Sequence, residues 1–341
     1  MDNRELCFKL TDAVGTSGDE YAACNAVKEY LEKYMPCETD RNGNVIGTAG
    51  DGNVHILLDA HIDQIGLIVR GIDEKGFLLI DKVGGVDLRT LTGAEVTVHG
   101  KEELFGVICS VPPHLQSASG NKDTLDIKKM AVDIGYSKED AEKYVSVGDR
   151  ITVRNSQLTL LNSNIASSAF DDRCAIAAIL KALELVNGKI PHLKLSVLFS
   201  AQEETGGSGA KTGAFSTMPD YAVVVDVGFG DDPYTDKAET IELSKGPSIG
   251  ISPVLDKETT LKLTELAKNK NIPYQHDVMG GRTGTNADSV SVTGCGVKTV
   301  LLSVPLRYMH TANEVINTDD VDYTAELIAE FLLAEEAECN A

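Results

Sequence analysis

The chain alternates between short apolar runs and amphipathic helical patterns, and one long stretch with only strand-like runs interrupts this alternation. The apolar runs of strand length lie at residues 54–60, 195–202, 221–226 and 298–303. The segments with apolar residues at three- and four-residue spacing lie at residues 19–35, 173–186, 257–270 and 318–336. Covered parallel strands have this continuous apolar character, and helices connect them. The alternation therefore predicts a three-layer α/β sandwich.

The interrupting stretch begins after Gly66 and is punctuated by glycine. Its strand-like segments lie at residues 67–72, 77–81, 95–99, 104–110 and 150–153, and a helical pattern is confined to about residues 126–144. Short strands separated by glycine are typical of a small β-barrel, so we expect an inserted barrel at residues 66–163. The α/β domain is then discontinuous and comprises residues 1–65 and 164–341.

Acidic and imidazole side chains recur where the predicted strands end and where one helix begins. These residues are His61, Asp63, Asp171, Glu203, Glu204, Asp226 and His310. In open α/β sheets, ligands bind outside the carboxyl ends of the strands, so these separate segments can converge in space. Two histidines and three carboxylates form a ligand set that suits zinc, cobalt or manganese. Neighbours on a strand point to opposite faces, so Glu203 and Glu204 need not share one role: one can bind a metal while the other handles a proton.

Each of these residues has a simpler interpretation when it is taken alone. A histidine after a strand is most often hydrogen-bonded rather than a ligand. Asp171 alone is a helix N-cap, Asp226 alone closes a turn, and the two adjacent glutamates form a solvated turn. The recurrence of such groups at equivalent places argues against coincidence. The histidines that keep the simpler interpretation are His55, His99, His192 and His276.

Acidic residues outnumber basic ones by 52 to 31, which gives a formal net charge of −21. This charge repels phosphate backbones and anionic membrane surfaces, so we expect no nucleic-acid and no membrane partner. It keeps a protein soluble or, alternatively, attracts cationic groups such as free amino termini and metal ions. Seven cysteines without a C-x-x-C pair do not predict a disulfide framework or a thiolate zinc site. The first residues lack the apolar core of a signal peptide and no run approaches transmembrane length, so we expect a cytoplasmic protein.

Several segments along nearly the whole chain resemble the M42 metallo-aminopeptidases, the group of di-metal exopeptidases that includes the tetrahedral aminopeptidases. The matching segments are Gly15-Thr16-Ser17-Gly18-Asp19-Glu20, Ala60-His61-Ile62-Asp63-Gln64-Ile65-Gly66, Gly84-Gly85-Val86-Asp87-Leu88-Arg89, Val111-Pro112-Pro113-His114-Leu115, Ala169-Phe170-Asp171-Asp172-Arg173, Gln202-Glu203-Glu204-Thr205-Gly206, Val225-Asp226-Val227-Gly228 and Arg307-Tyr308-Met309-His310. Their order and completeness make the resemblance specific.

The resemblance implies an α/β zinc-peptidase domain with an inserted β-barrel dimerisation domain. It implies two divalent metal ions, zinc or cobalt, and a substrate peptide with a free N-terminus. It assigns His61 and Asp226 to one metal, Glu204 and His310 to the other, and Asp171 to both. Glu203 is then the general base, and Asp63 orients His61, which agrees with the need of a ligating imidazole for an acceptor at its other nitrogen. Family members commonly form dimers that assemble into dodecamers, so we expect a homo-oligomer.

Two other functions are compatible with parts of this pattern. A glycoside hydrolase uses paired carboxylates and generally no metal, but it leaves the histidines unexplained, and an aromatic content of 5% without tryptophan suits sugars poorly. A non-catalytic metal-binding scaffold is the third possibility. The departures from the family pattern are Gln64, Ala175, Ser208 and Asn286. They spare the ligand set but leave the preferred N-terminal residue open.

Overall fold

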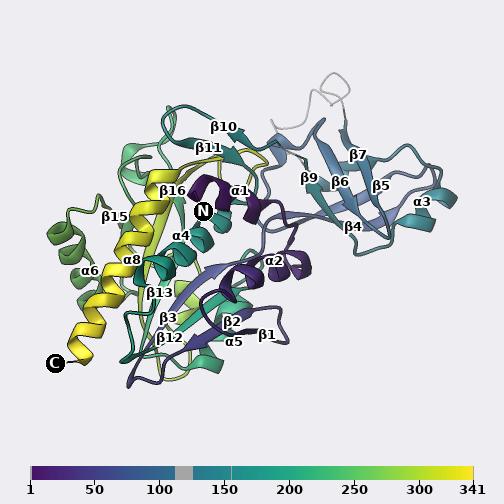
Figure 1. Ribbon diagram of the computed structural model, residues 1–341. Coiled ribbons are helices and arrows are strands. Elements are labelled where there is room, and N and C mark those ends of the chain that lie inside the picture. Colours follow the sequence, from purple (N-terminus) through teal and green to yellow (C-terminus); the bar gives the residue numbers. More distant parts are fainter. Residues whose placement is uncertain (1, 112–125, 155, 341) are drawn as a thin grey trace.

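The computed structural model describes residues 2–111, 126–154 and 156–340, which form an α/β body with a barrel at its side (Figure 1). Most of the quoted segment from Val111 to Leu115 therefore lies outside the described residues. The strands of the body are β1 (Cys37–Thr39), β2 (Val45–Ala49), β3 (Val54–His61), β10 (Leu158–Thr159), β11 (Asn164–Ser167), β12 (Leu193–Ser200), β13 (Tyr221–Phe229), β14 (Ser248–Ile251), β15 (Gln275–Val278), β16 (Lys298–Arg307) and β17 (Glu314–Asn317). Its helices are α1 (Asn3–Thr11), α2 (Tyr21–Leu31), α4 (Phe170–Val186), α5 (Ser208–Thr217), α6 (Lys257–Lys270), α7 (Ala287–Val290) and α8 (Thr318–Cys339).

The described strands of the body form one mixed sheet in the order β1-β2-β12-β3-β13-β16-β17-β11-β10, and β14 and β15 branch from β16. The pairs β12·β3, β3·β13 and β13·β16 are parallel. Parallel neighbours end at the same edge of a sheet, so the residues that follow these central strands meet there.

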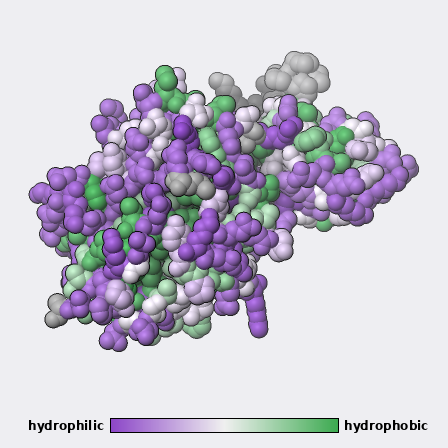
Figure 2. Space-filling model, viewed as in Figure 1, coloured by the Kyte–Doolittle hydropathy of each residue, from purple (hydrophilic) through white to green (hydrophobic). Residues whose placement is uncertain are grey.

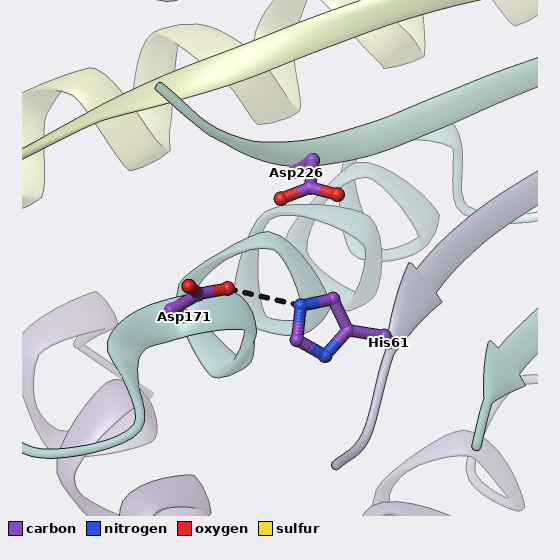
Figure 3. Close-up of side chains that lie close together, drawn as sticks. All are labelled: His61, Asp171 and Asp226. Atoms are coloured by element: carbon purple, nitrogen blue, oxygen red, sulfur yellow. Dashed lines mark hydrogen bonds and ion pairs between the residues drawn. The ribbon is translucent and has the colours of Figure 1, made fainter. Parts of the chain in front are cut away.

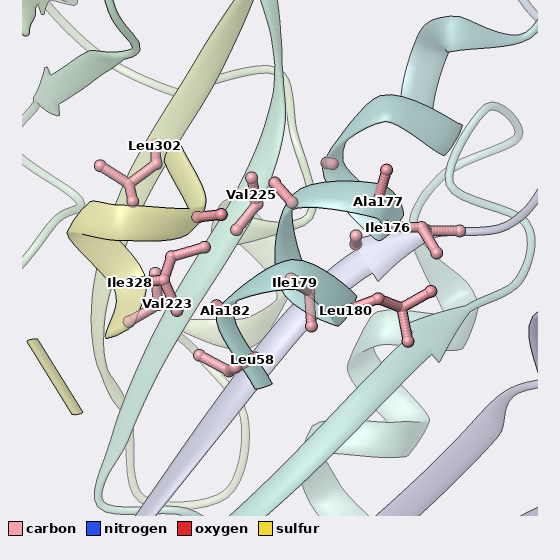
Figure 4. Packing of buried hydrophobic residues seen from close by; sticks show 14 of the residues in the cluster. Leu58, Ile176, Ala177, Ile179, Leu180, Ala182, Val223, Val225, Leu302 and Ile328 are labelled. Atoms are coloured by element: carbon pink, nitrogen blue, oxygen red, sulfur yellow. The ribbon is translucent and has the colours of Figure 1, made fainter. Parts of the chain in front are cut away.

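Helices cover both faces of the sheet, which makes three layers as the alternation predicted. On one face, Ile176 and Ile179 of α4 share a core with Leu58, Val225 and the helices α1, α2, α6 and α8 (Figure 4). On the other face, α5 and α7 pack against a second core that includes Leu57. Fully burying one such aliphatic side chain stabilises the fold by about 1.5–3 kcal/mol.

The interrupting stretch folds as a closed barrel, in agreement with the prediction. Its described strands are β4 (Gly66–Ile72), β5 (Leu78–Val83), β6 (Glu95–His99), β7 (Glu103–Ser110), β8 (Met130–Asp133) and β9 (Arg150–Val153), which close in the order β4-β5-β8-β7-β6-β9. Alternate side chains point into the barrel, among them Leu67, Val69, Val96 and Val98. The insertion thus has a core of its own beside that of the α/β body.

The helical pattern over residues 126–144 was only partly correct. A helix, α3 (Lys138–Tyr144), is present at the end of this range, but Met130–Asp133 forms strand β8. Ile127, Met130 and Ile134 are all buried at spacings of three and four residues, which imitates a helical face. Pairing of β8 with β5 and β7 closes the barrel, and this long-range pairing decides the local structure.

Polar residues cover most of the visible surface, with smaller apolar patches between them (Figure 2). Among the described helices, none combines the length and the apolar character needed to cross a bilayer.

Candidate metal centre

The predicted site residues meet at the carboxyl edge of the central parallel strands. His61 is the last residue of β3 and pairs with Ser200, the last residue of β12. Glu203 and Glu204 lie in the turn after β12, which ends at Ser200, two residues earlier than the predicted run. Strand β13 pairs with β3 as far as Val224 with Asp59, and Asp226 lies two residues further on, close to His61. The parallel register therefore gathers side chains that are far apart in the sequence.

Two local details differ from the expectation that these residues mark element ends. Asp226 lies within β13, because β13 stays paired with β16 as far as Phe229. Asp171 stands at the start of α4, but Asp171 and Asp172 have non-helical backbone angles, so the regular helix begins at Arg173. Asp171 does not act as an N-cap there, since Asp172 stands between it and the regular helix.

His61, Asp171 and Asp226 form a buried triad (Figure 3). The Nε2 atom of His61 lies 2.9 Å from Oδ1 of Asp171. One potential ligand atom from each of the three residues lies within 4.8 Å of the others. The side chains are at most 6% exposed. This compact set of one imidazole and two carboxylates could hold a metal ion.

Asp171, Glu204 and His310 form a second triad with the same spacing limit. The Nε2 atom of His310 lies 3.4 Å from Oδ2 of Asp171 and 3.5 Å from Oε1 of Glu204. Asp171 thus turns one carboxylate oxygen toward each triad. It is the shared member of the two.

Asp63 contacts Glu203 and two members of the triads, His61 and Glu204. Its carboxylate accepts hydrogen bonds from the main-chain N–H groups of Glu203, at 2.9 Å, and Glu204, at 3.1 Å. Its main-chain carbonyl lies 3.0 Å from Nδ1 of His61, while its carboxylate is 3.5 Å from the same nitrogen. The carbonyl is therefore the nearer acceptor for the His61 ring.

The charges of these buried groups depend strongly on one another. Burial raises the pKa of Glu204 to about 10, and the charge of Asp171 adds to this rise. Burial also raises the pKa of Asp226 well above its ordinary value. Burial acts in the same direction on Asp171, but hydrogen bonds from His310 and His61 outweigh it and lower the Asp171 pKa. Burial would lower the pKa of His61, yet its hydrogen bond with Asp171 raises that pKa well above the usual range.

The residues present fit a divalent cation. Oε1 of Glu204 is buried and has no hydrogen-bond partner among the residues that the structure describes. Several carboxylates that crowd together away from water are costly unless a cation compensates them. The nitrogen and oxygen donors of both triads are those that zinc and related metals bind in proteins.

Two residues that support the site, Glu314 and Asp172, were not predicted from the sequence. The Glu314 carboxylate is fully enclosed and accepts hydrogen bonds from the main-chain N–H groups of Asp171, at 3.2 Å, and His310, at 3.1 Å. Oδ2 of Asp172 accepts a hydrogen bond from the N–H of His61 at 3.2 Å. Their contacts are to backbone atoms, for which strand-end patterns give no signal. The adjacency of Asp172 to Asp171 was the only available indication.

Gly84 and Gly85, which follow β5 of the barrel, press against the second triad. A β-carbon on Gly84 would lie 2.9 Å from Oε2 of Glu204, and one on Gly85 would lie 2.6 Å from Cε1 of His310. Gly84 also has a φ of +76°, a conformation that glycine adopts most readily. The barrel thus forms one wall of the candidate centre.

One cavity of about 580 Å³ gives access to both triads. The predicted residues that line it are His61, Asp171, Glu203, Glu204, Asp226 and His310. Asp63 lies outside the cavity lining and reaches the centre through its hydrogen bonds. The histidines assigned to ordinary hydrogen bonding lie elsewhere: His55 contacts Ser196, His99 contacts Thr152, His192 contacts Glu336 and His276 contacts Thr264.

Fold and site together define an α/β protein with a candidate metal centre at the carboxyl edge of its sheet and a barrel beside it. Residues 43–327 match the sequence model of the M42 glutamyl aminopeptidase family. The chain therefore belongs to peptidase family M42. This confirms the family resemblance and the prediction of an enzyme of the aminopeptidase class.

Individual relatives agree with this membership. The lysyl aminopeptidase of Pyrococcus furiosus is 31% identical over 342 residues, which cover 98% of each chain. The crystal structure of a TET aminopeptidase from a marine-sediment Thaumarchaeota archaeon has a TM-score of 0.93 at 29% identity and covers 99% of this chain and 97% of that one. The Pyrococcus horikoshii TET1 peptidase, which can assemble into a tetrahedron or a large octahedral shell, has a TM-score of 0.84 at 32% identity and covers 97% and 99%.

Proposed function

We propose that the protein is a di-metal aminopeptidase that hydrolyses the N-terminal peptide bond of short peptides. The observation that carries this proposal is the shared position of Asp171, whose two carboxylate oxygens face two separate ligand triads. A carboxylate in this position can bridge two cations. Membership in family M42 supports the same function.

His61 and Asp226 would hold one ion, Glu204 and His310 the other, and Asp171 both. Zinc and cobalt both suit this ligand set. When bound, such ions supply Lewis-acid activation of water and polarisation of the scissile carbonyl. A free amino terminus of the substrate that binds at the centre would restrict cleavage to the first peptide bond.

Glu203 would act as the general base and then as the general acid. Its side chain lines the cavity without belonging to either triad, so its carboxylate is available to the reacting groups. It would take the proton of the attacking water and return it to the leaving amine. The hydrogen bond from the Glu203 N–H to Asp63 fixes the backbone that carries this carboxylate. Asp63 would therefore position both the base and the His61 ring.

Replacing Glu203 and Glu204 separately tests these assignments. Glu203→Gln should retain about two metal ions per chain and lose turnover of an aminoacyl amide by at least about a hundredfold. Glu204→Gln is the matched contrast, because it should lose bound metal as well. Normal turnover by Glu203→Gln would exclude the assigned base. One ion or none in the zinc-saturated wild-type protein would exclude the di-metal centre.

The rival functions give different results in the same assays. A carboxylate-pair glycoside hydrolase would cleave a cellulose oligomer in the presence of a chelator, but it gives the imidazoles of both triads no role. A non-catalytic scaffold would bind metal and hydrolyse no amide in a broad panel. Amide hydrolysis that stops on chelation and returns with added zinc or cobalt distinguishes the aminopeptidase from both.

The domain division into residues 1–65 with 164–341 and residues 66–163 stays a prediction, as does the role of the barrel in dimerisation. An apolar surface on the barrel supports this role, because Phe105 and Val107 of β7 are 63% and 46% exposed. Solved relatives form large assemblies, a dodecamer in one case and a tetrahedron or an octahedral shell in another, which makes a homo-oligomer of dimers the natural expectation. Light scattering on the purified protein, compared with a Phe105→Glu variant, tests this proposal.

A further inference from the structure

The cavity beside the candidate centre has a carboxylate on its far side. Asp277, in the short strand β15, lines the same cavity as Asp226 and His61. It belongs to neither metal-ligand triad. Its place in the sheet determines which way it points and how far it lies from the centre.

The strands β13, β16, β14 and β15 lie side by side in this order. Asp226 pairs with Ser303 and Ser303 with Ser248, so these residues share one face of the sheet. Asp277 pairs with Gly250, two residues beyond Ser248, and therefore points to the same face. Three strand spacings separate β13 from β15, which corresponds to about 14 Å.

The floor of the cavity between Asp226 and Asp277 carries Ser303 beside Asp226 and hydrocarbon around Gly250. Gly250 has no side chain, and a β-carbon there would lie 3.2 Å from both Leu301 Cβ and Met279 Cε. Leu301 and Met279 both line the cavity. A substrate side chain that crosses this floor passes Ser303 and then hydrocarbon before it meets the Asp277 carboxylate.

The Asp277 carboxylate has no hydrogen bond or ion pair with another described residue. Burial alone raises its pKa, and no neighbouring charge contributes. The other acidic residue of this wall, Asp288, is already engaged by the N–H and hydroxyl of Thr283 and by the N–H of Gly284. Arg282 also lines the cavity, but it is exposed on the loop after β15. Asp277 is thus the half-buried charge that a substrate can neutralise.

We propose that this pocket selects peptides whose N-terminal residue has a long cationic side chain, lysine or arginine, and that Asp277 receives its charged end. The inference rests on the proposed aminopeptidase function, which places the substrate amine at the metal centre. The methylenes of lysine or arginine pack on Leu301 and Met279, and the charged group pairs with the carboxylate. The acidic protein as a whole attracts the same substrates.

The comparison of lysyl and norleucyl amides measures the contribution of charge at constant side-chain length. In the metal-loaded wild-type protein, kcat/KM for the lysyl amide should exceed that for the norleucyl amide by at least about tenfold. Asp277→Asn should bring this ratio to within about threefold of one by lowering the lysyl value, and its cooperative thermal unfolding together with its bound metal shows that the variant is folded. Arg282→Gln is the matched control and should preserve the ratio.

Two results would overturn the assignment of a cationic specificity to Asp277. A lysyl-to-norleucyl ratio that Asp277→Asn leaves intact overturns the assignment of Asp277. A wild-type preference for the glutamyl amide that is lost in Arg282→Gln overturns the cationic specificity and assigns an acidic specificity to Arg282 instead. In both cases hydrolysis of amides would leave the proposed aminopeptidase function standing. Hydrolysis of no amide at all would overturn both proposals together.

Discussion

Gly85 lies so close to His310 that a β-carbon on the glycine would come within 2.6 Å of the imidazole Cε1. We predict that Gly85→Ala displaces the His310 ring, because the only other freedom is to move the barrel segment away from the body. A displacement of about 1 Å at a reacting centre can lower activity by about a hundredfold. Steady-state kinetics and zinc titration of the chelated protein measure the two expected losses.

Gly71→Ala is the control for this substitution. Gly71 also lies in the barrel, but a β-carbon there would make an ordinary contact of 3.7 Å with Leu79 Cδ1. This variant should keep wild-type activity and zinc affinity. If Gly85→Ala behaves like Gly71→Ala, the close approach of the barrel has no part in positioning His310.

Glu314 connects the backbones of Asp171 and His310, and we predict that Glu314→Gln weakens both triads. The glutamine amide has one oxygen acceptor, so its NH₂ group would face one of the two N–H donors that the carboxylate now accepts. Loss of a residue that orients ligands typically reduces metal affinity by about 10- to 100-fold. Calorimetric titration of the chelated variant with zinc gives this value directly.

The exposed Glu242 provides a control with the same chemical change. Glu242→Gln should bind zinc with wild-type affinity. Wild-type affinity in Glu314→Gln as well would mean that the two backbone segments are held in place without the Glu314 charge.

Asp320 gives a pH dependence that is independent of the metal centre. It is fully buried, and burial raises its pKa to about 6, against hydrogen bonds from the N–H groups of Ser244 and Gly246 that act to lower it. The folded state therefore binds this proton more tightly than the unfolded state, whose pKa is near the ordinary 3.8. Its contribution to the free energy of unfolding is largest below about pH 4 and decreases as the pH rises through 6, by at most about 3 kcal/mol.

Urea unfolding between pH 4 and pH 7, with a chelator present throughout, tests this sign. The unfolding free energy of the wild-type protein should fall relative to that of Asp320→Asn as the pH rises from 4 to 7. An unfolding free energy of the wild-type protein that rises relative to that of Asp320→Asn over this range would contradict the raised pKa of Asp320.

The convergence of His61, Glu203, Glu204, Asp226 and His310 could be predicted from the sequence, because it depends on a local pattern. Each residue stands in or just after an apolar run, and parallel strands end at one edge of the sheet. Helix α6 (Lys257–Lys270) was predicted with its observed bounds for a similar reason, since its apolar spacing and its ends are encoded locally. Structural features that depend only on a short local segment could therefore be predicted from the sequence.

Features that depend on distant pairing could not be read in this way. Met130 has helical spacing to its neighbours, and only the closure of the barrel places it in a strand. Glu314 acts through backbone N–H groups, which leave no trace in residue types. Asp277 stands in a four-residue strand of mixed polarity, and only the register from β13 across to β15 turns it toward the cavity.

The wall that Gly84 and Gly85 contribute has a consequence for how freely this protein can change. Replacement of outer residues of the barrel, or lengthening of its distant turns, should leave the peptidase chemistry of the body unchanged, because Gly85 is the one described barrel residue that lines the cavity at the centre. The connection after β5 should tolerate little change. A single added methyl group or one inserted residue there would displace the His310 imidazole, which belongs to another part of the chain. Natural variation should therefore be narrow at this one turn and broad over the rest of the insertion.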